Sequence, residues 1–405
     1  MADFFQNGSV ATLHRLGERS AQDLELELTK WSDESPMALV IPTLYSELDG
    51  PALSDIVDQV AQIPYLSQVI IGLDAAGPED FAHALRFFDR LSVPTRILWN
   101  DGPGLSAIDA ELARYDLAPP APGKGRNVWY CLGYFLAAGR AEVLALHDAD
   151  ILTYSRDIPA RLFYPLVHPG FEYAFSKGYY ARVGDGRLNG RASRLLVTPL
   201  LRALRYTLGP SPYLDYLDSF RYPLAGEMAM RDDVVRAIRI PSDWGLEIGI
   251  LSEVYRQYST QRVCQIDLAH HYDHKHQAPS PDDPEAGLHK MSIDISKAIY
   301  RKLAVQGAVL STEVFRTLKA AYYRSALDLV DWYHHDAVLN GLQQDRHGEE
   351  QVVEMFSGAL MTAGEQFLSN PMETPFMPSW SRVVSAVPDI LERLAAAVEA
   401  DNAAL

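Results

Sequence analysis

The stretch Val143-Leu144-Ala145-Leu146-His147-Asp148-Ala149-Asp150 decides the fold class. Its first four residues form a short continuous apolar run, as expected for a strand of a parallel sheet that is covered on both faces. The run ends in two carboxylates one residue apart, and such oxygen ligands suit Mg²⁺ or Mn²⁺, whose shell is often completed by substrate phosphates. Alone, an Asp-x-Asp pair is a weak signal, because such acids also cap helices or lie in solvent.

Similar apolar runs precede this strand. They lie at residues 37–41, which we expect Pro42 to end, at 68–73 and at 95–99, and helical patterns separate them at 52–62, 78–91 and 127–138. Strands that alternate with helices predict right-handed crossovers and an α/β fold with a mainly parallel, Rossmann-like sheet. Ligands bind beyond the carboxyl ends of such strands. Residues 42–47, Asp74 and 148–150 are expected to meet there.

Size and composition set the broad class. The chain has 405 residues, 48% of them apolar and 22% charged, which is typical of a globular protein with a large core. The formal charge of −17 argues against a nucleic acid or an anionic membrane as the main partner. Cys131 and Cys264 are too few for a disulfide framework. The N-terminus has no signal-like apolar segment, and no run nears the roughly 18 apolar residues of a membrane span, so we expect a cytoplasmic protein.

The character of the chain changes near residue 292. Helical spacing dominates residues 293–306, 311–333, 351–367 and 380–400, and residues 343–350 and 369–378 have the composition of linkers. We therefore predict three parts: an N-terminal extension (1–36), a sheet domain (37–291) and a helical C-terminal region (292–405).

A basic cluster stands out in this acidic chain. Seven cations face one acid, Asp185, and they are Lys177, Arg182, Arg187, Arg191, Arg194, Arg202 and Arg205. The cluster predicts an anionic substrate, since Arg191 and Ser193 at a loop-to-helix junction can present a guanidinium, a hydroxyl and helix N-terminal amides to a phosphate. The alternative, a solvated helix face, is expected for Arg202 and Arg205.

Two further groups can carry chemistry. Lys124 lies between Gly123 and Gly125 in a loop before a helix, where it could reach a diphosphate or simply lie in solvent. Four histidines, His270, His271, His274 and His276, follow a predicted strand. An imidazole beside the two aspartates suits an octahedral Mg²⁺ or Mn²⁺ site. A structural zinc site is the alternative, but no cysteine pair accompanies them.

Together these motifs resemble the retaining GT-A glycosyltransferases that make glucosyl-3-phosphoglycerate and their mannosyl-transferring relatives. The resemblance spans residues 38–276 and rests on several segments, which are Pro42-Thr43-Leu44-Tyr45-Ser46-Glu47, Gly123-Lys124-Gly125, Asp148-Ala149-Asp150, residues 190–201, Pro223-Leu224-Ala225-Gly226-Glu227 and Gly245-Leu246-Glu247-Ile248-Gly249. One departure is Ser46, which stands where the family has a glutamate that contacts the nucleotide.

The resemblance implies a role for each group. The nucleotide sugar would be held by Pro42, Thr43, Leu44, Glu47, Asp74, Lys124 and Asp148. The metal ion would be held by Asp148, Asp150 and one of His274 and His276. The acceptor would be held by Gly190, Arg191 and Ser193. The catalytic residues would be Asp150, Glu227 and Glu247.

The implied activity is metal-dependent transfer of glucose, with retention, from a nucleotide diphosphate sugar to the 2-hydroxyl of 3-phosphoglycerate, in compatible-solute synthesis. Mg²⁺ or Mn²⁺ would be the cofactor, and a homodimer is expected. Transfer of mannose, free glycerate as acceptor, and a non-catalytic nucleotide-binding regulator remain alternatives. An inverting polymer synthase is disfavoured, because the sequence lacks membrane helices and a Gln-x-x-Arg-Trp-type acceptor helix.

Overall fold

A mixed, mainly parallel sheet forms the centre of the molecule. The computed structural model describes residues 6, 8–274, 287–373 and 376–403. The strands follow one another across the sheet as β1 (Ala11–Leu13), β9 (Val263–Tyr272), β6 (Phe175–Gly184), β8 (Met228–Arg231), β5 (Val143–Leu146), β2 (Met37–Leu44), β3 (Leu66–Asp74) and β4 (Thr95–Trp99), with β7 (Arg187–Leu188) beside β6. β8 runs antiparallel to both of its neighbours, and the remaining pairs along this path are parallel.

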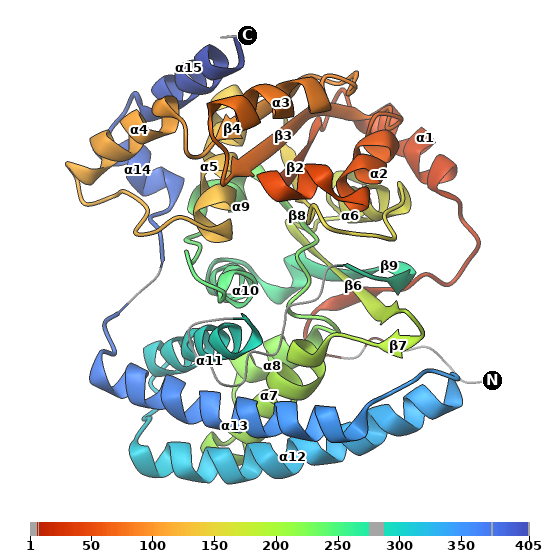
Figure 1. Ribbon diagram of the computed structural model, residues 1–405, viewed down its shortest axis with the longest axis vertical. Helices are drawn as coiled ribbons and strands as arrows, with labels where there is room; N and C mark the ends of the chain where they lie inside the picture. Colours follow the sequence, from red (N-terminus) through yellow and green to blue (C-terminus); the bar gives the residue numbers. More distant parts are fainter. Residues whose placement is uncertain (1–5, 7, 275–286, 374–375, 404–405) are drawn as a thin grey trace.

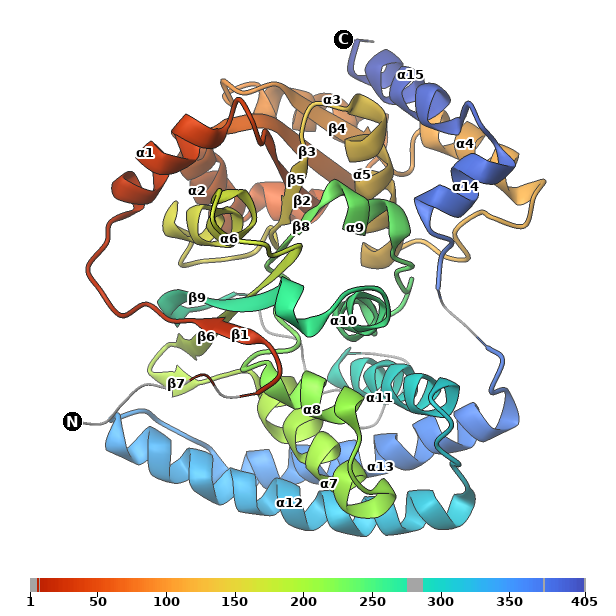
Figure 2. The same ribbon diagram turned by 180° about the vertical axis from the view of Figure 1, so that it is seen from behind.

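Helices cover both faces of this sheet (Figures 1 and 2). Alternate residues of β2 belong to different hydrophobic cores: Ala38 and Val40 pack in one, Leu39 and Ile41 in the other. This is why the strand has an unbroken apolar sequence. The helices of this half are α1 (Ala21–Trp31), α2 (Pro51–Val60), α3 (Pro78–Phe88), α4 (Pro103–Ala113), α5 (Lys124–Ala138), α6 (Asp157–Val167), α7 (Thr198–Leu208), α8 (Pro212–Ser219), α9 (Asp232–Ala237) and α10 (Leu246–Gln257).

Strand β2 does not end at Pro42, as expected from the sequence, but continues to Leu44. Val40 accepts a hydrogen bond from the His147 backbone, so Val40 points its backbone groups toward β5. Pro42, two residues on, points to the same side, where β5 has already ended at Leu146. The missing N–H of proline therefore leaves no strand partner unsatisfied, and on the other side Pro42 stays in register with Gly72 of β3.

The C-terminal helices lie in two places. α11 (Gly287–Val305), α12 (Thr312–Leu339) and α13 (Arg346–Ser369) pack together at the end of the molecule beyond α10 (Figures 1 and 2). The chain then returns to the sheet half, where α14 (Trp380–Ala386) packs against α9 and α15 (Ile390–Ala403) packs against α4, α5 and β4. The α/β fold with C-terminal helices is confirmed.

Two expectations for this region are wrong in detail. The single helix expected at 380–400 is two helices, because Pro388 disfavours a helical conformation at Val387. Part of the predicted linker at 343–350 belongs to α13, whose first turn is capped by the Asp345 side chain accepting from the Gly348 N–H. Among the described residues, no helix is long and apolar enough to cross a membrane.

Candidate active site

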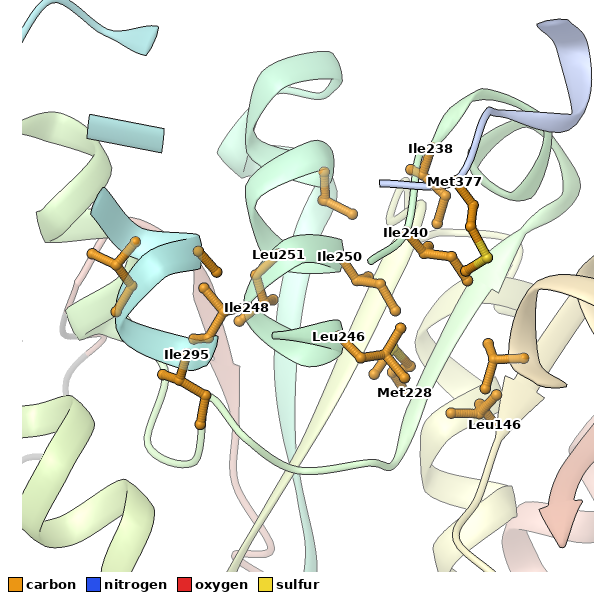
Figure 3. Packing of buried hydrophobic residues seen from close by; sticks show 14 of the residues in the cluster. Leu146, Met228, Ile238, Ile240, Leu246, Ile248, Ile250, Leu251, Ile295 and Met377 are labelled. Atoms are coloured by element: carbon orange, nitrogen blue, oxygen red, sulfur yellow. The ribbon is translucent and has the colours of Figure 1, made fainter. Parts of the chain in front are cut away.

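A hydrophobic core under the end of β5 positions the acidic residues. Leu146 of β5, Met228 of β8 and Leu246 of α10 are buried, and Figure 3 shows Leu246 beside Met228 with Leu146 across from them. Each is one or two residues away from an acid of the predicted site, respectively Asp148, Glu227 and Glu247. Three elements that are distant in sequence thus deliver three carboxylates to one place.

Lys124 joins two of these acids. Its Nζ lies 2.7 Å from Asp148 Oδ1 and 3.3 Å from Glu247 Oε1. Burial alone would lower the pKa of Lys124, but the two carboxylates outweigh it and hold the pKa well above its ordinary value. The predicted loop position is wrong: α5 begins at Lys124 rather than at Asn127. The lysine therefore stands at a helix N-terminus, where free backbone N–H groups favour an anion.

Two glycines make this assembly possible. A Cβ on Gly125 would lie 2.7 Å from the Ser242 Cα, so the start of α5 is pressed against the backbone that leads to α10. A Cβ on Gly226 would lie 2.7 Å from Cγ of Asp148, so only a glycine at position 226 leaves room for the Asp148 side chain. Burial opposes ionisation of Asp148, but the Lys124 ammonium dominates and lowers the pKa of the carboxyl.

Glu227 is held by two tyrosines. The side chain is fully buried, and Oε1 accepts from the Tyr272 hydroxyl at 2.6 Å while Oε2 accepts from the Tyr180 hydroxyl at 2.8 Å. The two phenol rings stack with centroids 3.6 Å apart. Burial, and then the negative charge of Asp148, raise the pKa of Glu227, whereas the two donated hydrogen bonds oppose that rise.

Asp150 and His274 meet because the chain segments that carry them pair as short strands. Ile151 and His274 form an antiparallel bridge, and the Leu152 N–H donates to the Asp273 carbonyl. His274 Nδ1 lies 3.6 Å from Asp150 Oδ2 and is buried without a hydrogen-bond partner among the described residues.

An orphaned imidazole nitrogen beside a carboxylate fits a divalent metal. Within the described part of the chain, however, no three His, Cys, Asp or Glu side chains are close enough together to form a metal site. His276, the second candidate, lies outside the described residues. The metal set of Asp148, Asp150 and a histidine therefore stays a prediction.

The residues predicted to hold the nucleotide lie along the same edge. Leu44, at the end of β2, is in register with Asp74, at the end of β3. Asp74 is buried and accepts a hydrogen bond from Asn127 of α5, and burial raises the pKa of its carboxyl. Pro42 and Thr43 precede Leu44 in β2, and Glu47 lies in the short helix Tyr45–Asp49 that follows.

Of the residues predicted to bind the acceptor, Gly190 is connected to Glu227 through Tyr222 and Tyr180. Gly190 has φ +79°, and a Cβ there would be 3.1 Å from the Tyr222 hydroxyl, whose ring packs against Tyr180. Arg191 is exposed, whereas Ser193 is buried and its Oγ has no hydrogen-bond partner among the described residues. Because this hydroxyl is closed off from solvent, a ligand could reach it only if neighbouring groups moved, and the acceptor role of Ser193 stays a prediction.

The side chains of the basic cluster lie in different environments. Arg194 is buried against Glu349, Arg205 pairs with Asp215 and Asp218 at the surface, and the Arg202 guanidinium lies over Trp332. These arginines have partners within the fold, so the local charge of the sequence overstates what is available to a substrate.

Lys177 is a site residue whose position the sequence did not reveal. It is buried, its ammonium donates to the Ala225 carbonyl, and burial lowers its pKa to about 8. The neighbouring charges of Glu247, Glu227 and Asp148 oppose this shift. The sequence analysis counted Lys177 in the basic cluster that predicts an anionic substrate, but it did not place the lysine beside the acidic residues. Tyr180 and Tyr272 were missed altogether.

No family model matches the chain. Over 402 residues, 99% of each chain, it is 44% identical to the glucosyl-3-phosphoglycerate synthase of Persephonella marina. The chain belongs to the glucosyl-3-phosphoglycerate synthase family. The enzyme of that name from Methanococcoides burtonii is 40% identical over 370 residues, 90% of each chain.

Solved structures agree in fold with this family assignment. Glucosyl-3-phosphoglycerate synthase from Mycobacterium tuberculosis, in complex with Mn²⁺, UDP-glucose and phosphoglyceric acid, superposes with a TM-score of 0.53 at 19% identity, covering 73% of this chain and 88% of that one. Mannosyl-3-phosphoglycerate synthase from Rubrobacter xylanophilus also gives 0.53 at 19% identity, covering 73% and 82%. At this identity the likeness is one of fold, and it supports the GT-A assignment.

Proposed function

We propose that this protein is a metal-dependent glucosyltransferase that moves glucose from UDP-glucose to the 2-hydroxyl of 3-phosphoglycerate and retains the anomeric configuration. The observation that carries the proposal is 44% identity to a glucosyl-3-phosphoglycerate synthase over 99% of both chains. The choice of UDP-glucose as donor rests on glucosyl-3-phosphoglycerate synthase from Mycobacterium tuberculosis, which was solved in complex with UDP-glucose. The site supports it, because Lys124 and Glu247, at the starts of α5 and α10, lie close to Asp148 and Glu227, at strand ends.

The donor would lie along the ends of β2, β3 and β5. Its nucleotide would contact residues 42–44, Glu47 and Asp74, and its diphosphate would approach Lys124 at the N-terminus of α5, where the ammonium and backbone N–H groups favour negative charge. Asp148, Asp150 and His274 or His276 would hold Mg²⁺ or Mn²⁺, which when bound offsets the charge that develops on the leaving diphosphate.

The sugar and the acceptor would meet beside Glu227. Glu227 and Glu247 can accept hydrogen bonds from sugar hydroxyls, and Glu227 is oriented for this by Tyr180 and Tyr272. Retention is expected without a protein nucleophile: the acceptor hydroxyl attacks from the leaving-group face, the bond from C1 to the phosphate oxygen breaks, and that oxygen takes the proton.

Arg191 and Ser193 would hold the acceptor phosphate. Each charge-assisted hydrogen bond contributes roughly 1.5–3 kcal/mol, so loss of one contact weakens binding about ten- to hundredfold. Free glycerate should therefore be a much poorer acceptor than 3-phosphoglycerate, and Arg191→Ala should shrink that preference. Arg202→Ala is the matched control, because the Arg202 guanidinium lies over Trp332. This variant should leave the preference for 3-phosphoglycerate over glycerate unchanged.

The deciding experiment is a matrix of donors and acceptors. UDP-glucose, GDP-glucose and GDP-mannose are each tested with 3-phosphoglycerate, glycerate and water, and NMR identifies the anomer of each product. α-Glucosyl transfer to 3-phosphoglycerate is expected. Preference for a mannosyl donor or for glycerate would replace the assignment with that of a related transferase, and absence of turnover with every pair would favour a nucleotide-binding regulator. We also expect a homodimer and a cytoplasmic location.

A further inference from the structure

The acceptor segment, residues 186–195 around the predicted acceptor residues 190–193, packs against the C-terminal helices. Arg194 lies in the π-helical turn Ala192–Val197, directly after Arg191 and Ser193, and its side chain is only 7% exposed. Its guanidinium donates to the carbonyls of Leu188 and Asn189, at 3.1 Å and 2.8 Å. One side chain thus holds the backbone on the approach to Gly190.

The remaining hydrogen bonds of Arg194 go to the C-terminal helices. Nη2 lies 2.6 Å from Oε1 of Glu349 in the first turn of α13, and Nη1 lies 3.4 Å from Oε2. Gln344 donates to the same carboxylate, and the Tyr333 ring of α12 lies 4.7 Å from the guanidinium. A buried ion pair is tolerated only when both charges keep their partners, so this contact demands a defined geometry.

Two further hydrogen bonds join the same parts of the molecule. The Gln343 N–H donates to the Gly186 carbonyl at 2.8 Å, and the Tyr322 hydroxyl donates to the Leu195 carbonyl at 2.6 Å. The segment from Gly186 to Leu195 is therefore held at both ends and in its middle by α12, α13 and the loop between them. Figures 1 and 2 show the two long helices lying beyond α7 and β7 in both views.

We propose that α12 and α13 act as a rigid backing for the acceptor segment, and that Glu349, acting through Arg194, is a positioning residue for Arg191 and Ser193. The inference rests on the proposed function, because it takes residues 190–193 as the acceptor site. It assigns to the C-terminal helices a part in acceptor affinity rather than in donor binding, since the donor residues lie on β2, β3, β5 and α5.

Glu349→Gln is the direct test, because the amide keeps the shape of the side chain and removes its charge. A displacement of about 1 Å at a reacting group can cost on the order of 100-fold, so we expect the KM for 3-phosphoglycerate to rise about ten- to hundredfold. The KM for UDP-glucose should change by less than about twofold. The matched control is Asp331→Asn, which removes an exposed ion pair between the same two helices and should change neither constant.

A second variant guards against a folding defect. Tyr333→Leu removes the ring beside the guanidinium without unpairing a buried charge, and it should also raise the KM for the acceptor selectively. If Glu349→Gln does not fold, a normal acceptor KM in Tyr333→Leu overturns the inference.

The double variant Arg191→Ala/Glu349→Gln separates positioning from mere stability. Because Glu349 acts through the placement of Arg191, the two effects on acceptor KM should be strongly non-additive, whereas independent effects add. Equal losses for donor and acceptor, an unchanged acceptor KM or simple additivity would each overturn the positioning role. Failure of the wild-type protein to use 3-phosphoglycerate would instead refute the proposed function itself.

Discussion

Removing the hydroxyl of Tyr272 should destabilise the protein more at pH 8 than at pH 5. Tyr272 and Tyr180 each donate to a different oxygen of the fully buried Glu227, which is the arrangement that an ionised carboxylate requires. Tyr272→Phe removes one of the two donors and leaves the ring and its stacking with Tyr180 in place. The variant therefore isolates one hydrogen bond to a buried charge.

The magnitude follows from the charge state of Glu227. A hydrogen bond to a charged group contributes about 1.5–3 kcal/mol, and one between neutral groups about 1 kcal/mol. Burial and Asp148 raise the pKa of Glu227 above its ordinary value of 4.5, so the wild-type protein loses stability as the pH rises through that raised pKa. Tyr272→Phe raises the pKa further and deepens the loss. The variant should be less stable than wild type by about 1.5–3 kcal/mol at pH 8, and this difference should shrink toward about 1 kcal/mol as the pH is lowered and Glu227 takes up a proton.

Urea unfolding at both pH values, without substrate or divalent metal, measures this difference. Tyr213→Phe is the matched control, because the Tyr213 hydroxyl is equally buried but pairs with the neutral Ser252 at 2.7 Å. It should cost about 1 kcal/mol at either pH. If Tyr272→Phe shows no greater pH dependence than Tyr213→Phe, Glu227 is not an ionised carboxylate held by tyrosines.

Three more predictions concern the site and its surroundings. Chelation by EDTA, and separately Asp150→Ala, should abolish turnover with the fold intact by circular dichroism; full activity in excess EDTA would contradict the metal assignment. Lys124→Met should impair the use of UDP-glucose more than that of the acceptor in separate titrations, because its ammonium faces the diphosphate, and an effect confined to the acceptor KM would place the lysine elsewhere. Burial raises the pKa of Asp243 from 3.8 to about 6. The wild-type protein therefore loses stability as the pH rises from about 4 to about 6, because a buried carboxyl must ionise. Asp243→Asn removes this loss and should be more stable than wild type above pH 7. Its gain, about 3 kcal/mol at most and less for a partly exposed side chain, should shrink as the pH falls toward 4 in urea titrations.

The first half of the sheet could be predicted from local sequence. Strands β2, β3 and β5 are buried on both faces, so their mainly apolar runs located them to within about three residues, and the edge strand β4 was located by its Ile97-Leu98-Trp99 run. β8 could not be found in this way, because Met228–Arg231 follows an irregular loop and its short apolar run is interrupted by Arg231. The break at Pro388 was missed because helical periodicity on both sides of it looked continuous.

The site residues also fall into those that local sequence reveals and those that it does not. Asp148, Lys124 and the glycines could be named because each lies in a short motif with its own local logic. Tyr180 and Tyr272 could not, because their importance comes from a shared partner, Glu227, which lies 47 and 45 residues away from them in sequence. Arg194 was misread for a similar reason: its charge is visible in the sequence, but its partner Glu349 lies 155 residues further on.

The charges around the end of β5 show why a divalent ion is expected on grounds beyond the Asp-x-Asp motif. The carboxylates of Asp148, Asp150, Glu227 and Glu247 lie there, and in the described part of the chain the lysines that face them are Lys124 and Lys177. Lys124 is already shared between Asp148 and Glu247, so little of its charge is left over for a ligand. A nucleotide diphosphate would add negative charge to a site that already has more acids than lysines, and this is costly in a partly buried location. Binding therefore requires additional positive charge, and the oxygen-rich side chains with the orphaned nitrogen of His274 suit a divalent cation that arrives with the donor.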